Sequence, residues 1–74
     1  MEARTVGSKL ISIVVPLHDE NESLPQLADE LRAVADRHAL QMEVLFVDDG
    51  SRDGSWETIC RLADADSRVR GIRF

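Results

Sequence analysis

The chain has 74 residues, 43% hydrophobic and 31% charged, a composition typical of a globular domain rather than a disordered segment. Its 14 acidic residues outnumber 9 basic ones, and the net charge of −5 disfavours nucleic acid as a partner because non-specific binding needs Lys and Arg to neutralise phosphates. One cysteine excludes an internal disulfide and fits a reducing compartment, and the apolar run of residues 10–17 is too short to span a bilayer.

Residues 1–9 show no periodicity, and we expect a flexible leader there. Residues 10–15 are β-branched and almost entirely apolar, which predicts a strand covered on both faces. Pro16 is expected to end this strand because proline cannot donate a hydrogen bond to a central ladder.

A helix is predicted next, since apolar residues recur on one helical face over residues 24–35. Asp19 or Asn21 can cap its amino end. Pro25 is tolerated only in the first turn, so the helix should begin near residue 22.

Residues 42–47 form a second apolar segment of the buried-strand type, and residues 48–54 follow as a turn with two glycines. A second amphipathic helix comes next, in which we expect both Trp56 and Cys60 to be buried packing residues. Residues 69–74 alternate apolar and polar side chains and predict a third strand.

The order β-α-β-α-β predicts an α/β fold, with a parallel sheet, right-handed crossovers and helices packed against the sheet. In such sheets ligands bind beyond the carboxyl ends of the strands. Two acidic segments, residues 18–22 and 48–49, follow the first two strands and should therefore lie side by side. The last strand reaches the chain end without a cap or turn, which predicts a partial domain over residues 10–74, truncated after the third strand.

The chemistry of these segments leaves several functions open. Residues 16–22 contain no GxGxxG and no GxxxxGK[ST], which excludes a dinucleotide fold and a P-loop, and their acidity disfavours a nucleotidyltransferase. Asp48 and Asp49 can be turn residues or acceptors for a base or ribose, whereas a receiver domain would place its acidic residues after other strands. His18 can be a metal ligand, a general base, a stacking surface or a solvated loop residue.

Residues 11–22, followed by residues 44–55, together resemble the family 2 inverting glycosyltransferases, in particular the branch similar to dolichol-phosphate mannose synthase that makes polyprenyl-phosphate sugars. The likeness covers roughly residues 10–74. It implies a GT-A fold, a Rossmann-like arrangement of which this segment is the nucleotide-binding half.

The resemblance also implies a nucleotide site built from both strand ends. Its nucleotide-binding positions are Pro16, His18, Glu20, Val47 and Asp49, and its supporting turn consists of Asp48, Gly50 and Ser51. His18 stands where the family usually has Tyr, and Asp19 where it has Asn. An imidazole can still stack on a base, but the choice between uracil and guanine is left open.

By this resemblance the full-length enzyme transfers a sugar from a UDP- or GDP-sugar to an acceptor, polyprenyl phosphate, at the cytoplasmic face of a membrane. The catalytic base and the ligands of Mg²⁺ or Mn²⁺ are expected outside this chain, so the 74 residues alone should be inactive. Asp64 and Asp66 match the DxD pattern in sequence, but we do not expect them to be the metal-binding motif. They fall in the predicted second helix, where we expect a solvated surface. The alternative is a non-catalytic α/β binding or interaction module.

Overall fold

The computed structural model describes residues 2–6 and 10–74, with side chains from residue 10 onward. Its elements are β1 (Glu2–Val6), β2 (Leu10–Leu17), α1 (Leu24–Arg37), β3 (Gln41–Asp48), α2 (Ser55–Ala65) and β4 (Val69–Arg73). One sheet has the strand order β1-β2-β3-β4, in which β2, β3 and β4 are parallel and β1 runs antiparallel to β2. The predicted α/β fold with a β-α-β-α-β unit is confirmed.

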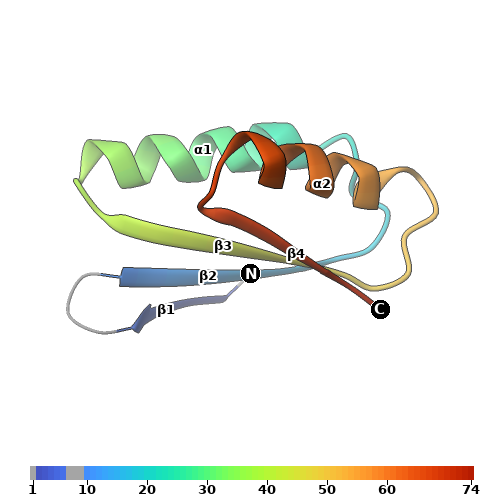
Figure 1. The fold of residues 1–74 in the computed structure, drawn as a ribbon, viewed down its shortest axis with the longest axis horizontal. Coiled ribbons are helices and arrows are strands. Elements are labelled where there is room, and N and C mark those ends of the chain that lie inside the picture. The colour runs from blue at the N-terminus through green and yellow to red at the C-terminus, as the bar shows by residue number, and fades with distance from the viewer. Residues whose placement is uncertain (1, 7–9) are drawn as a thin grey trace.

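Both helices lie over the same face of the sheet (Figure 1). This follows from the strand order, because consecutive parallel strands joined by crossovers of one hand place their helices on one side. In the described part of the chain the opposite face carries no helix, and Val14, Leu45 and Val47 on it are half-buried. The strands were expected to be covered on both faces; the described residues cover the face toward α1 and α2 and leave the other face half-buried.

The hydrophobic core fills the space between the helices and the sheet. Alternation along the strands turns every second side chain toward the helices, and Phe46 in the carboxyl-terminal half of β3 is 0% exposed. Leu24 of α1 and Ile59 of α2 are almost fully buried above it. Gly71 in β4 lies directly under α2, where an added Cβ would come within 2.5 Å of Ile59 Cγ2.

The amino-terminal segment differs from the prediction of a flexible leader. Glu2–Val6 forms strand β1, whose five residues pair with the strand residues from Val14 back to Leu10. The segment Glu-Ala-Arg-Thr-Val lacks the continuous apolar run by which the other strands were predicted. The remainder of the predicted leader, residues 1 and 7–9, lies outside the described residues.

Strand β2 also continues past the expected end at Pro16 and finishes at Leu17. Within the described residues the pairing with β1 runs from Leu10 to Val14, whereas Pro16 and Leu17 are paired in register with Val47 and Asp48 of β3. The expectation that Pro16 ends the strand is therefore wrong.

Two expectations for the helices are also wrong. Helix α1 begins after Ser23, and neither Asp19 nor Asn21 caps it, although Pro25 does lie in the first turn as predicted. In α2, Cys60 is exposed rather than buried, because the adjacent Ile59 occupies the position that points into the core. The buried side chains of α2 are those of Ser55, Thr58 and Ile59, and Cys60 lies about 100° further round the helix from Ile59, on the exposed side.

Trp56, by contrast, packs against the core, as expected, and the Arg73 guanidinium lies 5.8 Å from the centre of its ring.

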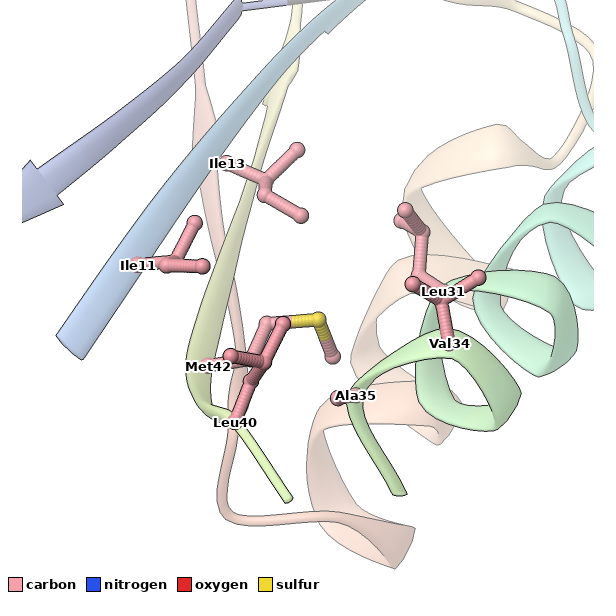
Figure 2. Close-up of a pocket in the computed structure, with 7 residues that line it drawn as sticks. All are labelled: Ile11, Ile13, Leu31, Val34, Ala35, Leu40 and Met42. Atoms are coloured by element: carbon pink, nitrogen blue, oxygen red, sulfur yellow. The ribbon is translucent and has the colours of Figure 1, made fainter. Parts of the chain in front are cut away.

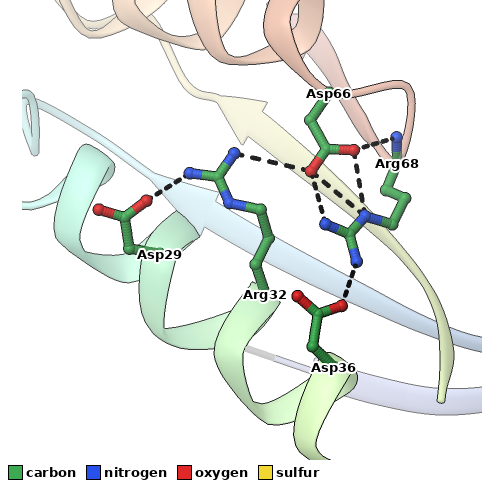
Figure 3. Close-up of polar contacts among 5 residues, drawn as sticks. All are labelled: Asp29, Arg32, Asp36, Asp66 and Arg68. Carbon is green, nitrogen blue, oxygen red and sulfur yellow. Dashed lines mark hydrogen bonds and ion pairs between the residues drawn. The ribbon is translucent and has the colours of Figure 1, made fainter. Parts of the chain in front are cut away.

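Near the amino ends of the parallel strands, an ion-pair cluster joins α1 to the segment between α2 and β4 (Figure 3). Arg68 binds Asp66 through Nη2 at 2.9 Å and through Nε at 3.1 Å, and its Nη1 lies 3.3 Å from Asp36. Arg32 of α1 lies 3.6 Å from Asp66 and also contacts Asp29. The Asp66 side chain is only 11% exposed, so the expectation of a solvated surface is wrong for this residue.

The same end of the molecule has an apolar hollow of about 140 Å³ between α1 and strands β2 and β3 (Figure 2). It is lined by Ile11, Ile13, Leu31, Val34, Ala35, Leu40 and Met42. The hollow lies at the opposite end of the strands from the acidic loops. No helix in the described part of the chain is long and apolar enough to cross a membrane.

Candidate functional site

The loops that follow β2 and β3 lie against each other at the carboxyl ends of the strands, as predicted. The Asp49 amide donates to the Leu17 carbonyl at 3.0 Å and continues the contact between the two strands. Pro16 and Val47 are paired in the register of these strands. The two sequence motifs therefore form one continuous rim.

Three successive amides of the first loop are held by side chains of the second. The amides of residues 19, 20 and 21 donate to Ser51 Oγ at 2.8 Å, Ser55 Oγ at 3.1 Å and Asp53 Oδ2 at 3.1 Å. These contacts fix the backbone of the first loop before α1 begins. They also leave these amides engaged, so they do not form the open amide cradle that binds phosphate in glycine-rich loops.

Ser51 connects the two loops from a buried position. Its hydroxyl accepts the Asp19 amide, and its own amide donates to Asp48 Oδ1 at 2.9 Å. In return, Asp19 Oδ1 accepts the Arg52 amide at 2.8 Å. Asp48 is 0% exposed, and its Oδ2 atom has no hydrogen-bond partner within the described residues. Asp48 thus holds the turn from within while Asp49 and Gly50 remain exposed on the rim.

Asp53 and Ser55 were not recognised from the sequence as contacts of the first loop. Asp53 Oδ1 accepts both the hydroxyl of Ser55, at 2.5 Å, and its amide, at 3.0 Å. The Ser55 hydroxyl, followed by the Asn21 amide, lowers the pKa of Asp53 below its usual value. A signal was present in the sequence, since short oxygen-bearing side chains are concentrated over residues 51–55.

His18 stands exposed on the rim and contacts both loops. Its Nδ1 lies 2.7 Å from the Asp49 carbonyl oxygen, and its Nε2 lies 3.2 Å from Asp19 Oδ2. The hydrogen bond to the Asp49 carbonyl, followed by the charge of Asp19, raises the pKa of His18 above its usual value of 6.5. The structure thus brings His18 and Asp49 together, as the resemblance implied.

An apolar row crosses the face of the sheet that the helices leave open, just below this rim. Pro16, Val47 and Ile72 are paired in register across β2, β3 and β4. Pro16 and Ile72 are exposed and Val47 is half-buried. Glu20, the remaining predicted site residue, is exposed on the first loop. The rim therefore combines a flat apolar surface with carboxylates at its border.

The model of the glycosyl transferase family 2 matches residues 12–74. The chain belongs to this family.

Three curated relatives with the name undecaprenyl-phosphate 4-deoxy-4-formamido-L-arabinose transferase resemble the chain. The protein from Aeromonas hydrophila is 45% identical over 65 residues, which cover 86% of this chain and 20% of the relative. The protein from Shewanella sediminis is 43% identical over 63 residues, covering 84% of this chain and 19% of the relative. That from Pseudomonas syringae is 42% identical over 60 residues, 80% of this chain and 18% of the relative. The chain thus spans about a fifth of the length of these relatives.

Family 2 glycosyltransferases commonly use a divalent metal ion, for which the acidic residues of the rim are the candidate ligands. Within residues 2–6 and 10–74, no group of three or more His, Cys, Asp or Glu side chains is placed to hold a metal ion. The carboxylates of Asp19, Asp48 and Asp53 each accept backbone amides of the loops instead. These residues do not fit a metal, and Asp66 is bound to arginine far from the rim.

The exposed border of this rim carries the carboxylates of Asp19, Glu20 and Asp49. Exposed carboxylates and carbonyls accept hydrogen bonds from N–H and O–H groups of a ligand. Several carboxylates together repel an anionic group. The rim therefore offers hydrogen-bond acceptors beside an apolar surface.

Proposed function

We propose that the rim formed by the loops after β2 and β3 binds the nucleotide of a sugar donor, UDP-sugar or GDP-sugar. The observation that carries this proposal is the set of hydrogen bonds from residues 19–21 to Ser51, Asp53 and Ser55, because it joins both family motifs into one rigid rim. Membership of the glycosyl transferase family 2 supports it.

In this proposal each part of the rim has a distinct task. Pro16 and Val47 offer an apolar surface for one face of the base, and His18 and Glu20 border it. Asp49 is the exposed carboxylate at the end of β3 and accepts a hydrogen bond from a base N–H or a ribose hydroxyl. The supporting turn of Asp48, Gly50 and Ser51 holds Asp49 in place from the buried side.

We further propose that the whole enzyme transfers its sugar to a polyprenyl phosphate, with inversion at the anomeric carbon, at the cytoplasmic face of a membrane. The names of the relatives, which specify undecaprenyl phosphate, support this acceptor class. Direct displacement requires a base that deprotonates the acceptor and a metal that stabilises the leaving diphosphate. Neither is assigned to residues of this chain, so we expect the 74 residues alone to be inactive.

A ¹⁵N–¹H correlation spectrum of the chain, titrated with UDP and then with GDP, tests the nucleotide site. We expect the amides of residues 47–51 and of Leu17 to shift for one of the two nucleotides, which would identify the donor class. Asp49→Asn should weaken that binding on the order of tenfold, because a hydrogen bond to a charged acceptor is lost.

Asp64→Asn is the matched control, since Asp64 is exposed on α2 away from the rim and its loss should leave binding unchanged. A well-dispersed spectrum that responds to neither nucleotide would reject the nucleotide site. That result would favour the alternative function, a non-catalytic α/β interaction module.

A further inference from the structure

A buried threonine of α2 reaches the first loop of the rim. Thr58 lies about one turn into the helix and is only 3% exposed. Its hydroxyl donates to the Asn21 side-chain oxygen, 37 positions away in the sequence, and accepts from Arg61 Nη2 at 2.9 Å. A guanidinium can only donate, so the hydrogen of this buried hydroxyl needs an acceptor, which the amide oxygen of Asn21 supplies. The orientation of the Asn21 side chain is thereby fixed.

Asn21 is held at two points. Its amide donates to Asp53 Oδ2 at 3.1 Å, and its side chain is bound by Thr58. The peptide that joins it to Glu20 is engaged on the other side as well, because the Glu20 carbonyl accepts the Ser23 amide at 3.1 Å. Glu20 is thus exposed on the rim while the backbone that carries it is anchored to α2.

We propose that Thr58 and Asn21 form a clamp that positions Glu20 at the rim. Thr58 is buried and Asn21 is half-buried, so both are positioning residues that act through Glu20. The anchors of the first loop described above lie within residues 51–55, in the turn or at the first residue of α2, whereas the clamp ties the loop to the body of the helix. The effect of the clamp on ligand affinity rests on the proposed function.

The clamp can be measured without a ligand, by amide hydrogen exchange. Thr58→Val replaces the hydroxyl by a methyl group of nearly the same shape, so the helix keeps its packing while the Asn21 oxygen loses its donor. One hydrogen bond changes an equilibrium by roughly three- to tenfold, and we expect the amides of residues 20 and 21 to exchange faster by about this factor. The Leu40 amide, held by the Ala35 carbonyl at the opposite end of α1, should exchange as in the native protein.

Two further variants test whether the hydroxyl acts through Asn21. Thr58→Ser keeps the hydroxyl and should restore the native exchange. Asn21→Ala removes the acceptor and should accelerate exchange at residue 20 as Thr58→Val does. The double variant should be no faster than either single variant, because the two changes remove the same contact.

The same variants are then titrated with UDP and with GDP. We expect the affinity for the nucleotide that the native chain binds to fall on the order of threefold in Thr58→Val, because a smaller fraction of molecules then holds Glu20 in the binding position. Thr58→Ser should recover the native affinity. Cys60→Ser is the control, since it also changes a single atom and is exposed on the same helix, and it should alter neither exchange nor affinity.

The outcomes separate the clamp from the nucleotide site. Unchanged exchange at residues 20 and 21, or an equal acceleration at Leu40, would overturn the clamp. A local acceleration combined with unchanged affinity would overturn the positioning role and leave the nucleotide site standing. If neither nucleotide binds the native chain while the local acceleration is observed, the proposed function is rejected and the clamp is supported.

Discussion

Replacing Asp66 by Asn tests the ion-pair cluster between α1 and the α2–β4 segment. The side-chain hydrogen bond from Arg68 is the main cause that lowers the pKa of Asp66 to about 2, from an ordinary value of 3.8. One pKa unit corresponds to about 1.4 kcal/mol, which sets an upper limit of about 2.5 kcal/mol for the charge of Asp66 at neutral pH. Arg68 and Asp36 are exposed to solvent, which screens the attraction between charges. We therefore expect the charge of Asp66 to contribute about 1–2 kcal/mol to the free energy of unfolding.

The pH dependence follows from the direction of this shift. A carboxylate with a lowered pKa in the folded state contributes its full stability above the unfolded value of 3.8, and loses it as the pH falls toward 2. Asp66→Asn should therefore lower the free energy of unfolding by about 1–2 kcal/mol at pH 7, and the difference from the native protein should shrink between pH 4 and pH 2.

Urea unfolding followed by circular dichroism at several pH values measures both effects. Asparagine keeps an oxygen that can accept the Arg68 amide, so this variant removes mainly the charge. Asp64→Asn is the control, because Asp64 is exposed and its replacement should change stability by less than about 0.5 kcal/mol. The reasoning is refuted if Asp66→Asn is as stable as the native protein at pH 7, or if its deficit is the same at pH 2.

Three further predictions concern packing and exposure. Gly71→Ala should destabilise the protein by about 1–3 kcal/mol in thermal unfolding, because the new Cβ would meet Ile59 at 2.5 Å, and an unchanged melting temperature would contradict that contact. Phe46→Ala should lower the free energy of unfolding by about 3–5 kcal/mol, because Phe46 is fully buried. Phe74→Ala should change it by less than about 0.5 kcal/mol, because the Phe74 side chain is 78% exposed. Equal losses for the two variants would contradict the placement of the core. Cys60 should react with a thiol reagent in the native protein about as fast as in urea, and protection in the native state would show that it is buried.

Much of the fold could be predicted from local patterns. Apolar runs with β-branched residues predicted β2 and β3, and the helical spacing of apolar residues predicted α1. Strand β1 was missed because its sequence, Glu-Ala-Arg-Thr-Val, lacks the continuous apolar run by which β2 and β3 were predicted. The burial of Cys60 was wrong because the apolar face of a helix is wide enough to include it, and only the rotation of α2 against the sheet shows that Ile59 points inward.

For the candidate site too, the sequence predicted the general position of the residues but not their individual contacts. The positions of the acidic segments at strand ends predicted that they meet, and the hydrogen bond between His18 and the Asp49 carbonyl agrees with this. The sequence did not indicate that Ser55 and Asp53 would hold the first loop. These contacts join residues 32 to 35 positions apart. The short oxygen-bearing side chains of residues 51–55 indicate hydrogen bonds to backbone amides, but they do not indicate which distant amides are the partners.

The sequence by itself determined the order of the elements from β2 to β4, the α/β class and the rim on which the two motifs meet, because each depends on local periodicity and on the known handedness of parallel crossovers. Only the tertiary structure decided which oxygen accepts which amide, that Asp66 pairs with Arg68, and that His18 faces two acceptors. Partners are selected by distances of a few ångströms, and those distances are set by the register of β2 against β3 and by the seating of each helix on the sheet.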